Sequence, residues 1–249
     1  MTLPAVVAAL AGAMLGSIAG SFIATLCIRW ARGERVARGR SHCDACGSPL
    51  APRDLVPFLS LALAGGRSRC CGVAVDPLHS RVELMAAGLG GLAMALAPDE
   101  RGAALALFAW LLLPLALLDA RHFWLPDRLT VALALAGLVL GQFVSGHALP
   151  DRLIGGAVAW ASLALLGGLY RRLRGRDGLG MGDAKLFGAI GLWTGWMALA
   201  PILLVASLAG LAVAMLAGKA AGDRLPFGTL LAAGAFLWSA SFLRGSAFL

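Results

Sequence analysis

Eight apolar runs, separated by short breaks that contain proline and charged residues, most limit how this chain can fold. A helix needs about 20 apolar residues to cross a bilayer, within a range of roughly 17–25. Runs of this length therefore predict an all-α polytopic membrane protein with about eight transmembrane helices and one long cytoplasmic loop. The expected spans are residues 3–28, 82–97, 102–118, 129–146, 153–169, 184–198, 199–217 and 227–243.

The composition agrees with a chain that lies mostly in lipid. Hydrophobic residues make up 59% and charged residues 14% of the sequence, whereas a soluble domain has roughly 45–50% and about 25%. The sixth and seventh runs have almost no polar break between them, only Pro201, so the boundary between these two is the least defined of all the boundaries. In the first run, Gly12, Gly16 and Gly20 recur every four residues and predict a face on which another helix can approach closely.

The basic residues indicate the orientation of the chain in the membrane. If the N-terminus lies outside, only Arg101, Arg152 and Arg244 of the 21 Lys and Arg residues fall on the periplasmic side. Because cytoplasmic segments carry the excess of positive charge, we expect both termini in the periplasm and the protein in the bacterial inner membrane. The net charge of +8 then reflects topology and lipid contact, and we expect no nucleic-acid partner.

The sequence divides into three expected parts. Residues 1–30 form the first transmembrane helix, residues 31–80 a cytoplasmic loop that contains cysteines, and residues 81–249 the transmembrane core. The N-terminus lacks a basic segment before its first apolar run, so we expect this run to stay as a helix and not to be cleaved as a signal peptide.

The loop contains the pattern of a zinc site. Cysteines in a cytosolic loop bind metal more often than they form disulfides, and Cys43-x-x-Cys46 followed by glycine is typical of a zinc knuckle. A second knuckle ending at Cys71 would need a cysteine at position 68, where Ser68 stands.

Two interpretations of the loop stay open. In one, the thiolates of Cys43, Cys46 and Cys71 bind zinc. The fourth ligand would be one of the following: Cys70, His42, His79 or water. In the other, the loop holds reduced thiols and no metal.

Acidic residues near the ends of apolar helices are candidates for function, because charge near membrane depth is costly. Asp119 follows an apolar run, where a carboxylate opposes the helix dipole and capping does not explain it. Asp183 follows a segment with glycines at positions 178, 180 and 182. Its position at the start of an apolar run is compatible with an N-cap and also with a functional role. Asp127 is expected to be an N-cap, and Lys185 an interfacial anchor.

Two carboxylates that lie side by side cannot both ionise cheaply, so one holds a proton and the other does not. An ionised carboxylate can take a proton from water while its protonated neighbour donates to a peptide carbonyl, as in aspartic proteases. Asp119 and Asp183 are therefore expected to form such a pair.

The motifs around these acids resemble those of the bacterial type IV prepilin peptidases, which are GxGD aspartic proteases. Gly180-Met181-Gly182-Asp183 before Ala184-Lys185-Leu186 is similar to one family motif, and Asp119 followed by Leu125-Pro126-Asp127 to the other. Further similar segments are Gly20-Ser21-Phe22, Val82-Glu83-Leu84 and Pro226-Phe227-Gly228.

The resemblance implies that Asp119 and Asp183 are the catalytic pair of a multi-pass aspartic endopeptidase. Members of the family cleave the basic leader of prepilins or type II secretion pseudopilins and often N-methylate the new N-terminus with S-adenosylmethionine. Paired C-x-x-C motifs accompany the bifunctional form, and Ser68 departs from that pattern. The alternatives are an ion- or proton-coupled transporter with membrane carboxylates and a zinc-loop scaffold without catalysis.

Overall fold

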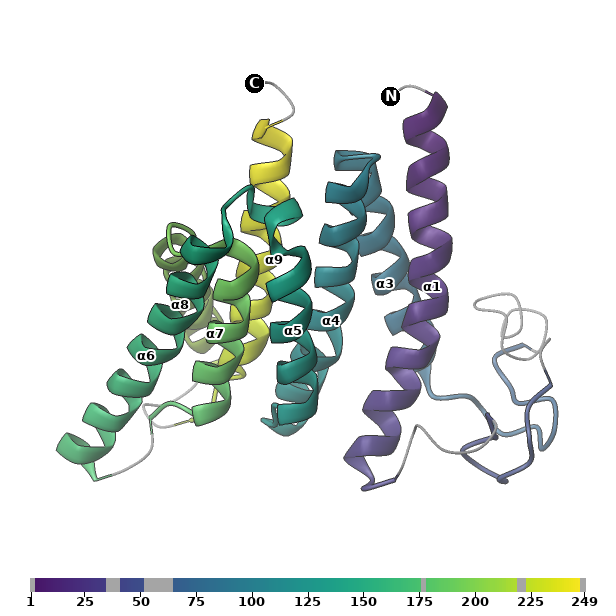
Figure 1. The fold of residues 1–249 in the computed structure, drawn as a ribbon. Coiled ribbons are helices and arrows are strands. Elements are labelled where there is room, and N and C mark those ends of the chain that lie inside the picture. Colours follow the sequence, from purple (N-terminus) through teal and green to yellow (C-terminus); the bar gives the residue numbers. More distant parts are fainter. Residues whose placement is uncertain (1–2, 35–40, 52–64, 176–177, 219–222, 247–249) are drawn as a thin grey trace.

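The chain is helical throughout the part that the computed structural model describes, residues 3–34, 41–51, 65–175, 178–218 and 223–246. Eight helices lie in these residues, and the only strand-like pairings there are two isolated bridges. The predicted all-α fold is confirmed. The helices are α1 (Leu3–Ala31), α3 (Pro77–Leu96), α4 (Glu100–His122), α5 (Asp127–Ser145), α6 (Leu149–Arg174), α7 (Met181–Thr194), α8 (Leu199–Leu216) and α9 (Phe227–Ser246) (Figure 1).

Each predicted apolar run corresponds to one helix, but two of these helices differ from the rest. Six of the described helices are long and apolar enough to cross a membrane, and α3 and α7 are not among them. Helix α7 has 14 residues, about 21 Å of helix, which is less than the roughly 30 Å of a bilayer core. It ends at Gly195, whose φ of 76° is easily adopted by glycine, so the break between the sixth and seventh runs precedes Pro201.

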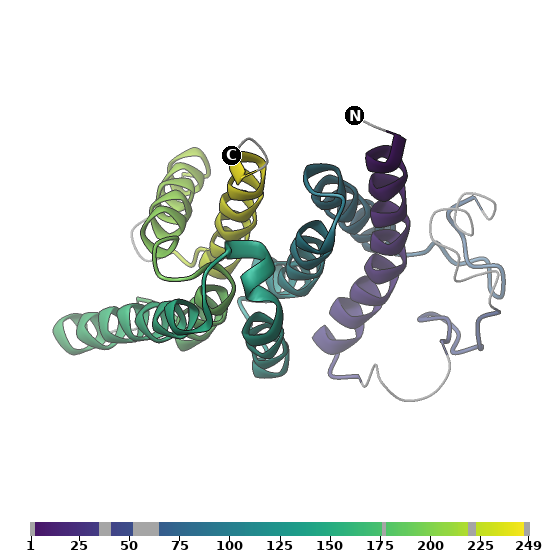
Figure 2. The ribbon, with the colours of Figure 1, turned by 45° about the horizontal axis from the view of Figure 1, so that its top comes forward.

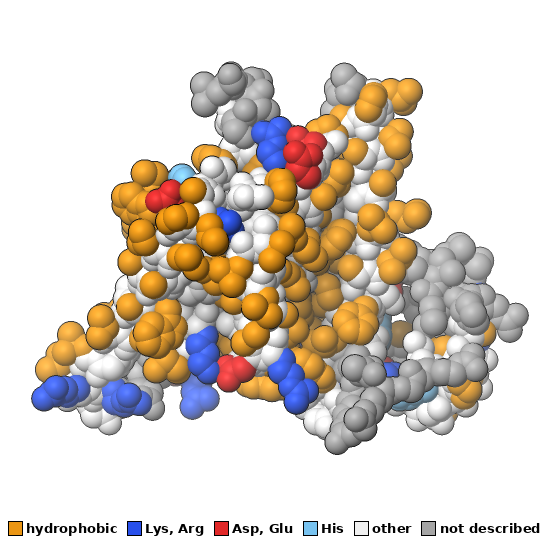
Figure 3. Space-filling view, viewed as in Figure 1, with side chains coloured by type: hydrophobic (Ala, Val, Ile, Leu, Met, Phe, Trp, Pro, Cys, Tyr) orange, Lys and Arg blue, Asp and Glu red, His pale blue; other side chains and the backbone are white. Residues whose placement is uncertain are grey.

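Helix α4 lies between two groups of helices. On one side it packs against α1 and α3, and on the other against α5 and α9, while α7 contacts α5, α6 and α9. Figures 1 and 2 show this order, and in Figure 1 both chain termini lie at the top while the described part of the cysteine-containing loop lies beside the lower half of α1. On the face shown in Figure 3, hydrophobic side chains predominate between the ends of the bundle, and most charged side chains lie near its ends.

The glycine face predicted in α1 is confirmed as a packing surface. A Cβ atom added to Gly12 would lie 2.5 Å from the carbonyl oxygen of Gly90, and one on Gly20 would lie 2.7 Å from the Cα of Glu83. These separations leave no room for a side chain, so the backbones of α1 and α3 are in direct contact.

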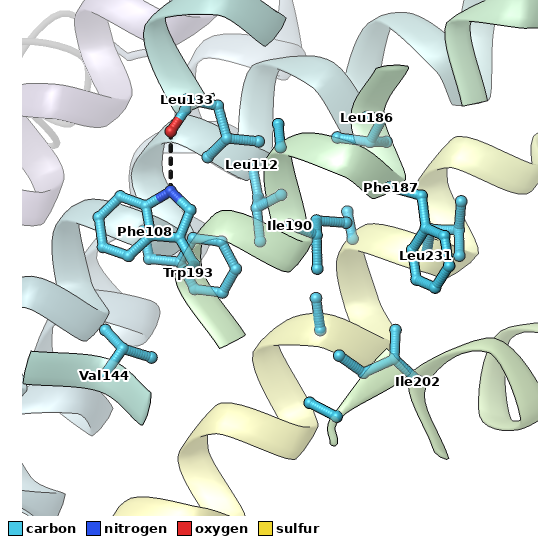
Figure 4. Packing of buried hydrophobic residues seen from close by; sticks show 14 of the residues in the cluster. Phe108, Leu112, Leu133, Val144, Leu186, Phe187, Ile190, Trp193, Ile202 and Leu231 are labelled. Carbon is cyan, nitrogen blue, oxygen red and sulfur yellow. Dashed lines mark hydrogen bonds between the residues drawn. The ribbon is translucent and has the colours of Figure 1, made fainter. Parts of the chain in front are cut away.

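Helix α7 is fixed by a core of large side chains. The ring of Trp193 stacks on Phe108 of α4 with centroids 4.7 Å apart, and its indole N–H donates to the carbonyl of Leu133 in α5 at 2.8 Å (Figure 4). Phe187 and Ile190 of α7 are also buried in this cluster. The short helix is thereby held at a defined depth and rotation against its longer neighbours.

A buried arginine also holds the C-terminal end of α7. Arg152 of α6 is 2% exposed, and its Nη1 donates to the carbonyl of Gly137 in α5 at 2.6 Å and lies 3.4 Å from that of Leu192 in α7. A cation near the last carbonyls of a helix complements the helix dipole. Arg152 therefore joins three helices from a buried position.

Candidate functional site

Asp119 lies three residues before the end of α4 and is buried. The helix stops because Phe123 adopts a left-handed conformation (φ 50°), and the Phe123 N–H donates to the carbonyl of Asp119 at 2.9 Å. Phe123 is the one non-glycine residue with positive φ in the described chain. The chain turns here toward α5, so the carboxylate faces the helices that follow.

The start of α9 binds the Asp119 carboxylate. Oδ2 of Asp119 accepts the backbone N–H of Thr229 at 2.7 Å and the Thr229 hydroxyl group at 3.0 Å. The same hydroxyl oxygen lies 2.8 Å from the carbonyl of Ala116. Free N–H groups at a helix start favour a negative charge, so this arrangement stabilises the ionised carboxylate.

Thr229 was missed by sequence reasoning, although the preceding segment to Gly228 was singled out. The sequence feature that could have indicated Thr229 is a hydroxyl residue directly after glycine at the start of an apolar run, a pattern typical of a helix N-terminus. That pattern predicts a cap for the residue's own helix. It does not predict that the hydroxyl reaches an acid 110 positions earlier.

Asp183 is the third residue of α7, and its N–H donates to the carbonyl of Gly180 at 3.1 Å. No side chain caps this helix, so Asp183 does not act as an N-cap. Its carboxyl group lies close enough to Asp119 for the two charges to interact, and both carboxyl groups also interact with the backbone N–H of Gly228. The structure thus brings the two predicted acids together around the start of α9.

Two glycines and a leucine pack against the acids. A Cβ atom on Gly228 would lie 3.1 Å from the Asp119 carboxyl group and 3.0 Å from Leu125, and one on Gly182 would lie 3.1 Å from Leu125. These separations are shorter than most Cβ contacts, so a larger residue at Gly228 would require Leu125 or the Asp119 carboxyl group to shift.

The expected N-cap role of Asp127 is wrong. Pro126 occupies the cap position of α5, Asp127 is the first helical residue, and no side chain caps the helix. The Asp127 carboxylate instead accepts from Nζ of Lys185 at 2.7 Å. This ion pair joins the start of α5 to the start of α7, where Lys185 stands two residues after Asp183.

The cysteine loop contains two turns of the same design, 25 positions apart. In the first, the Cys43 N–H donates to Ser48 at 2.8 Å and the Gly47 N–H to Cys43 at 2.9 Å. In the second, Ser68 N–H donates to the carbonyl of Val73 and Gly72 N–H to that of Ser68, both at 2.8 Å. Ser68 therefore occupies the place of the first cysteine in a second knuckle.

Cys70 lies beside the other three thiols. The sulfur atoms of Cys43, Cys46, Cys70 and Cys71 all lie within 4.8 Å of one another, with 3.8 Å between Cys43 and Cys71 and 3.4 Å between Cys46 and Cys70. Consecutive side chains diverge in extended backbone, but Cys70 and Cys71 lie in a turn. Cys70 can therefore reach the same point as Cys71.

The hydroxyl of Ser68 lies among these sulfur atoms. It is 3.4 Å from Sγ of Cys43 and 3.0 Å from Sγ of Cys70. Hydrogen bonding to Ser68, with a further contribution from the Cys46 backbone, lowers the pKa of the Cys43 thiol to about 6. A thiolate is the form that binds metal.

Comparison with known proteins agrees with this geometry. A family described as "Type IV leader peptidase family" matches residues 106–215, and the "Bacterial Peptidase A24 N-terminal domain" matches residues 14–97. The prepilin leader peptidase/N-methyltransferase of Aeromonas hydrophila is 37% identical over 216 residues, covering 82% of this chain and 73% of the relative. That of Pseudomonas aeruginosa is 35% identical over 212 residues with the same coverage, and that of Klebsiella pneumoniae is 37% identical over 183 residues, covering 73% and 80%. No solved structure matches the chain.

Proposed function

Because this chain belongs to the type IV leader peptidase family, we propose that it is an aspartic endopeptidase of the inner membrane that also N-methylates its product. Its substrates are prepilins or pseudopilins, and the cleaved bond joins the basic leader to the mature chain. The relatives' names support both activities. Neither family description nor any of these names is that of a transporter, so the transporter alternative has no support.

The observation that carries the peptidase proposal is the meeting of Asp119 and Asp183 at the start of α9. Two hydrogen bonds from Thr229 favour the ionised form of Asp119. Asp119 is then the base that takes a proton from the attacking water, and Asp183 is the acid that donates to the carbonyl oxygen of the scissile bond. As the intermediate collapses, Asp119 gives the proton that it took from water to the cleaved amide nitrogen, and the former carbonyl oxygen returns its proton to Asp183.

The orientation follows from the basic residues. The end of α4 and the start of α7, which carry the acids, lie at the bundle end opposite both termini (Figure 1). The helix ends on this side of the bundle carry the following arginines: Arg121, Arg128, Arg171, Arg172 and Arg174. The positive-inside rule then gives a cytoplasmic active site and periplasmic termini. Of the basic residues assigned to the cytoplasm, several lie outside the described part of the chain: Arg35, Arg38, Arg40, Arg53, Arg176 and Lys219.

The four thiols of the loop fit a structural zinc ion. A tetrahedral site with Zn–S bonds of about 2.3 Å needs sulfur atoms about 3.8 Å apart, which is close to the separations between Cys43 and Cys71 and between Cys46 and Cys70. A bound ion would join the two turns and stabilise the loop. Elemental analysis of purified protein should give one zinc per chain, lost in Cys43→Ser, and protein that methylates without zinc would overturn this assignment.

The peptidase proposal is tested with Asp119→Asn and Asp183→Asn, which keep the shape of each side chain and remove its charge. Each should abolish cleavage of a prepilin peptide while the protein still inserts and accumulates. Glu100→Gln at the opposite end of α4 is the matched control and should cleave normally. Near wild-type cleavage by purified Asp183→Asn enzyme would overturn the mechanism.

A further inference from the structure

The connection between α4 and α5 places one leucine side chain between the segments that hold the paired acids. Helix α4 ends at His122 and α5 begins at Asp127, so the chain turns within residues 123–126. Leu125 is partly buried and packs against the main hydrophobic cluster. The two aromatic side chains before it in the connection are exposed. Leu125 therefore points into the bundle, unlike its two predecessors.

The backbone on both sides of Leu125 is restricted. Phe123 ends α4 in the left-handed conformation, and its N–H donates to the carbonyl of Asp119 at 2.9 Å. Pro126 follows Leu125, and a residue before proline favours extended conformations. The carbonyl of Pro126 accepts the N–H of Leu129 at 3.1 Å in the first turn of α5. The chain itself thus holds Leu125 at a defined position.

Leu125 packs against the start of α7, directly before Asp183. A Cβ atom added to Gly182 would lie 3.1 Å from Cβ of Leu125 and 3.3 Å from its Cδ1. These separations are tighter than most Cβ contacts, so glycine allows the leucine to approach the backbone of α7 this closely. The position of Leu125 therefore sets how near the backbone beside Asp183 comes to the end of α4.

The same leucine packs against the start of α9. A Cβ atom added to Gly228 would lie 3.0 Å from Cδ1 of Leu125. The next residue, Thr229, donates to the Asp119 carboxylate through its N–H at 2.7 Å and its hydroxyl group at 3.0 Å. Leu125 therefore contacts the backbone beside one acid and the backbone beside the residue that binds the other acid.

We propose that Leu125 is a positioning residue that sets the spacing of Asp119 and Asp183, an inference that rests on the proposed peptidase function. Its side chain is a spacer shared by the starts of α7 and α9, so a change in its size shifts the two acids relative to each other. Proton transfer by the pair depends on their distance from each other and from the peptide bond. A misplacement of about 1 Å can cost roughly 100-fold in rate.

Leu140 provides the comparison with a leucine that only fills space. It is also partly buried against the same hydrophobic cluster, but it lies toward the other end of α5. Leu125→Ala and Leu140→Ala both remove methyl groups that pack against the core, so both variants should melt below the wild type. Only Leu125→Ala should impair cleavage, because only Leu125 contacts the segments that hold the acids.

Steady-state cleavage of a prepilin peptide by the purified full-length protein tests the proposal. In Leu125→Ala, kcat should fall roughly 10–100-fold with little change in KM, because the acids move relative to the bond that they cleave. Leu125→Met conserves the volume of the side chain and should keep kcat within a few-fold of wild type. Leu125→Val gives the same test as the alanine variant with a smaller loss of packing. If kcat of both shortened variants equals that of Leu140→Ala, Leu125 only fills space.

Gly182→Ala tests the same contact from the side of α7. Its methyl group would press against Leu125, so kcat should fall about tenfold or more. The loss should be smaller in the Leu125→Ala background, where most of the opposing side chain is removed. Gly88→Ala in α3 is the matched control, because nothing lies within 4 Å of a Cβ atom there, and it should cleave normally. Additive effects of the two changes on log kcat would contradict the proposed contact.

The wild-type enzyme separates this proposal from the peptidase function on which it rests. A wild-type protein that cleaves no prepilin peptide would contradict the peptidase function. Normal cleavage by the wild type, together with undiminished kcat in the shortened Leu125 variants, would contradict only the role of Leu125.

Discussion

At the scale of single residues, Thr229 is the side chain whose removal tests the role of Asp119 most directly. Thr229→Val removes the hydroxyl donor to Oδ2 but keeps the shape of the side chain and the backbone N–H. A hydrogen bond to a charged group contributes about 1.5–3 kcal/mol, so kcat for leader cleavage should fall roughly 10–100-fold. KM for a prepilin peptide should change little.

Thr229→Ser is the matched control, because it keeps the hydroxyl group. It should retain cleavage within a few-fold of wild type, and both variants should melt at similar temperatures. A Thr229→Val enzyme with unchanged kcat would show that the backbone N–H alone holds Asp119.

The residues also show how far sequence reasoning reached. Asp119 was singled out by its position at the end of an apolar run, whereas for Asp183 an N-cap stayed open until the family resemblance was added, and the catalytic role of both acids stays a prediction. Thr229 and the Asp127–Lys185 pair were not found, because each interaction depends on which helices meet, and periodicity within a single run carries no such information. The place of Cys70 was likewise undecided, because the answer depends on a turn that is visible only in three dimensions.

At the scale of elements, the short helix α7 depends on its neighbours for position. Arg152 binds carbonyls of α5 and α7 from a buried position. Arg152→Met fills similar volume but removes these hydrogen bonds, and the loss should lower the free energy of unfolding by about 1–3 kcal/mol. Because α7 carries Asp183, cleavage should fall as well.

Thermal unfolding in detergent measures this loss, and Arg101→Met is the control. Arg101 forms a partly exposed ion pair with Asp99 at 2.9 Å, and such pairs contribute about 0–1 kcal/mol. Equal melting temperatures for the two variants would show that Arg152 does not hold α7.

The ion pair between Asp127 and Lys185 is a second link to α7, and it is exposed. Asp127→Lys or Lys185→Asp alone sets like charges against each other, whereas the double exchange restores an opposite pair. We expect a coupling energy of about 0.2–1 kcal/mol in a double-mutant cycle. Additive effects of the two changes would mean that the contact does not position α7.

The fold itself was easier to predict than the contacts between its helices. Long apolar runs require helices in lipid, because lipid leaves backbone groups no other partner. The sequence could not reveal that α7 is too short to span alone, since its apolar run continues almost unbroken into α8. Packing of α7 against α5, α6 and α9, with the Trp193 ring stacked on α4, makes that short length tolerable.

At the scale of the whole molecule, the paired acids lie at one end of the bundle and both termini at the other, so a topology experiment tests the compartment of the peptidase site. Arg174 at the end of α6 and Glu100 at the start of α4 are exposed and lie at opposite ends. If positive charge holds the loop end inside, a membrane-impermeant maleimide should label Arg174→Cys only in inverted vesicles. It should label Glu100→Cys only in spheroplasts. Peptide mapping distinguishes these sites from native cysteines. The opposite labelling pattern would place the paired acids on the other side of the membrane from an unexported leader.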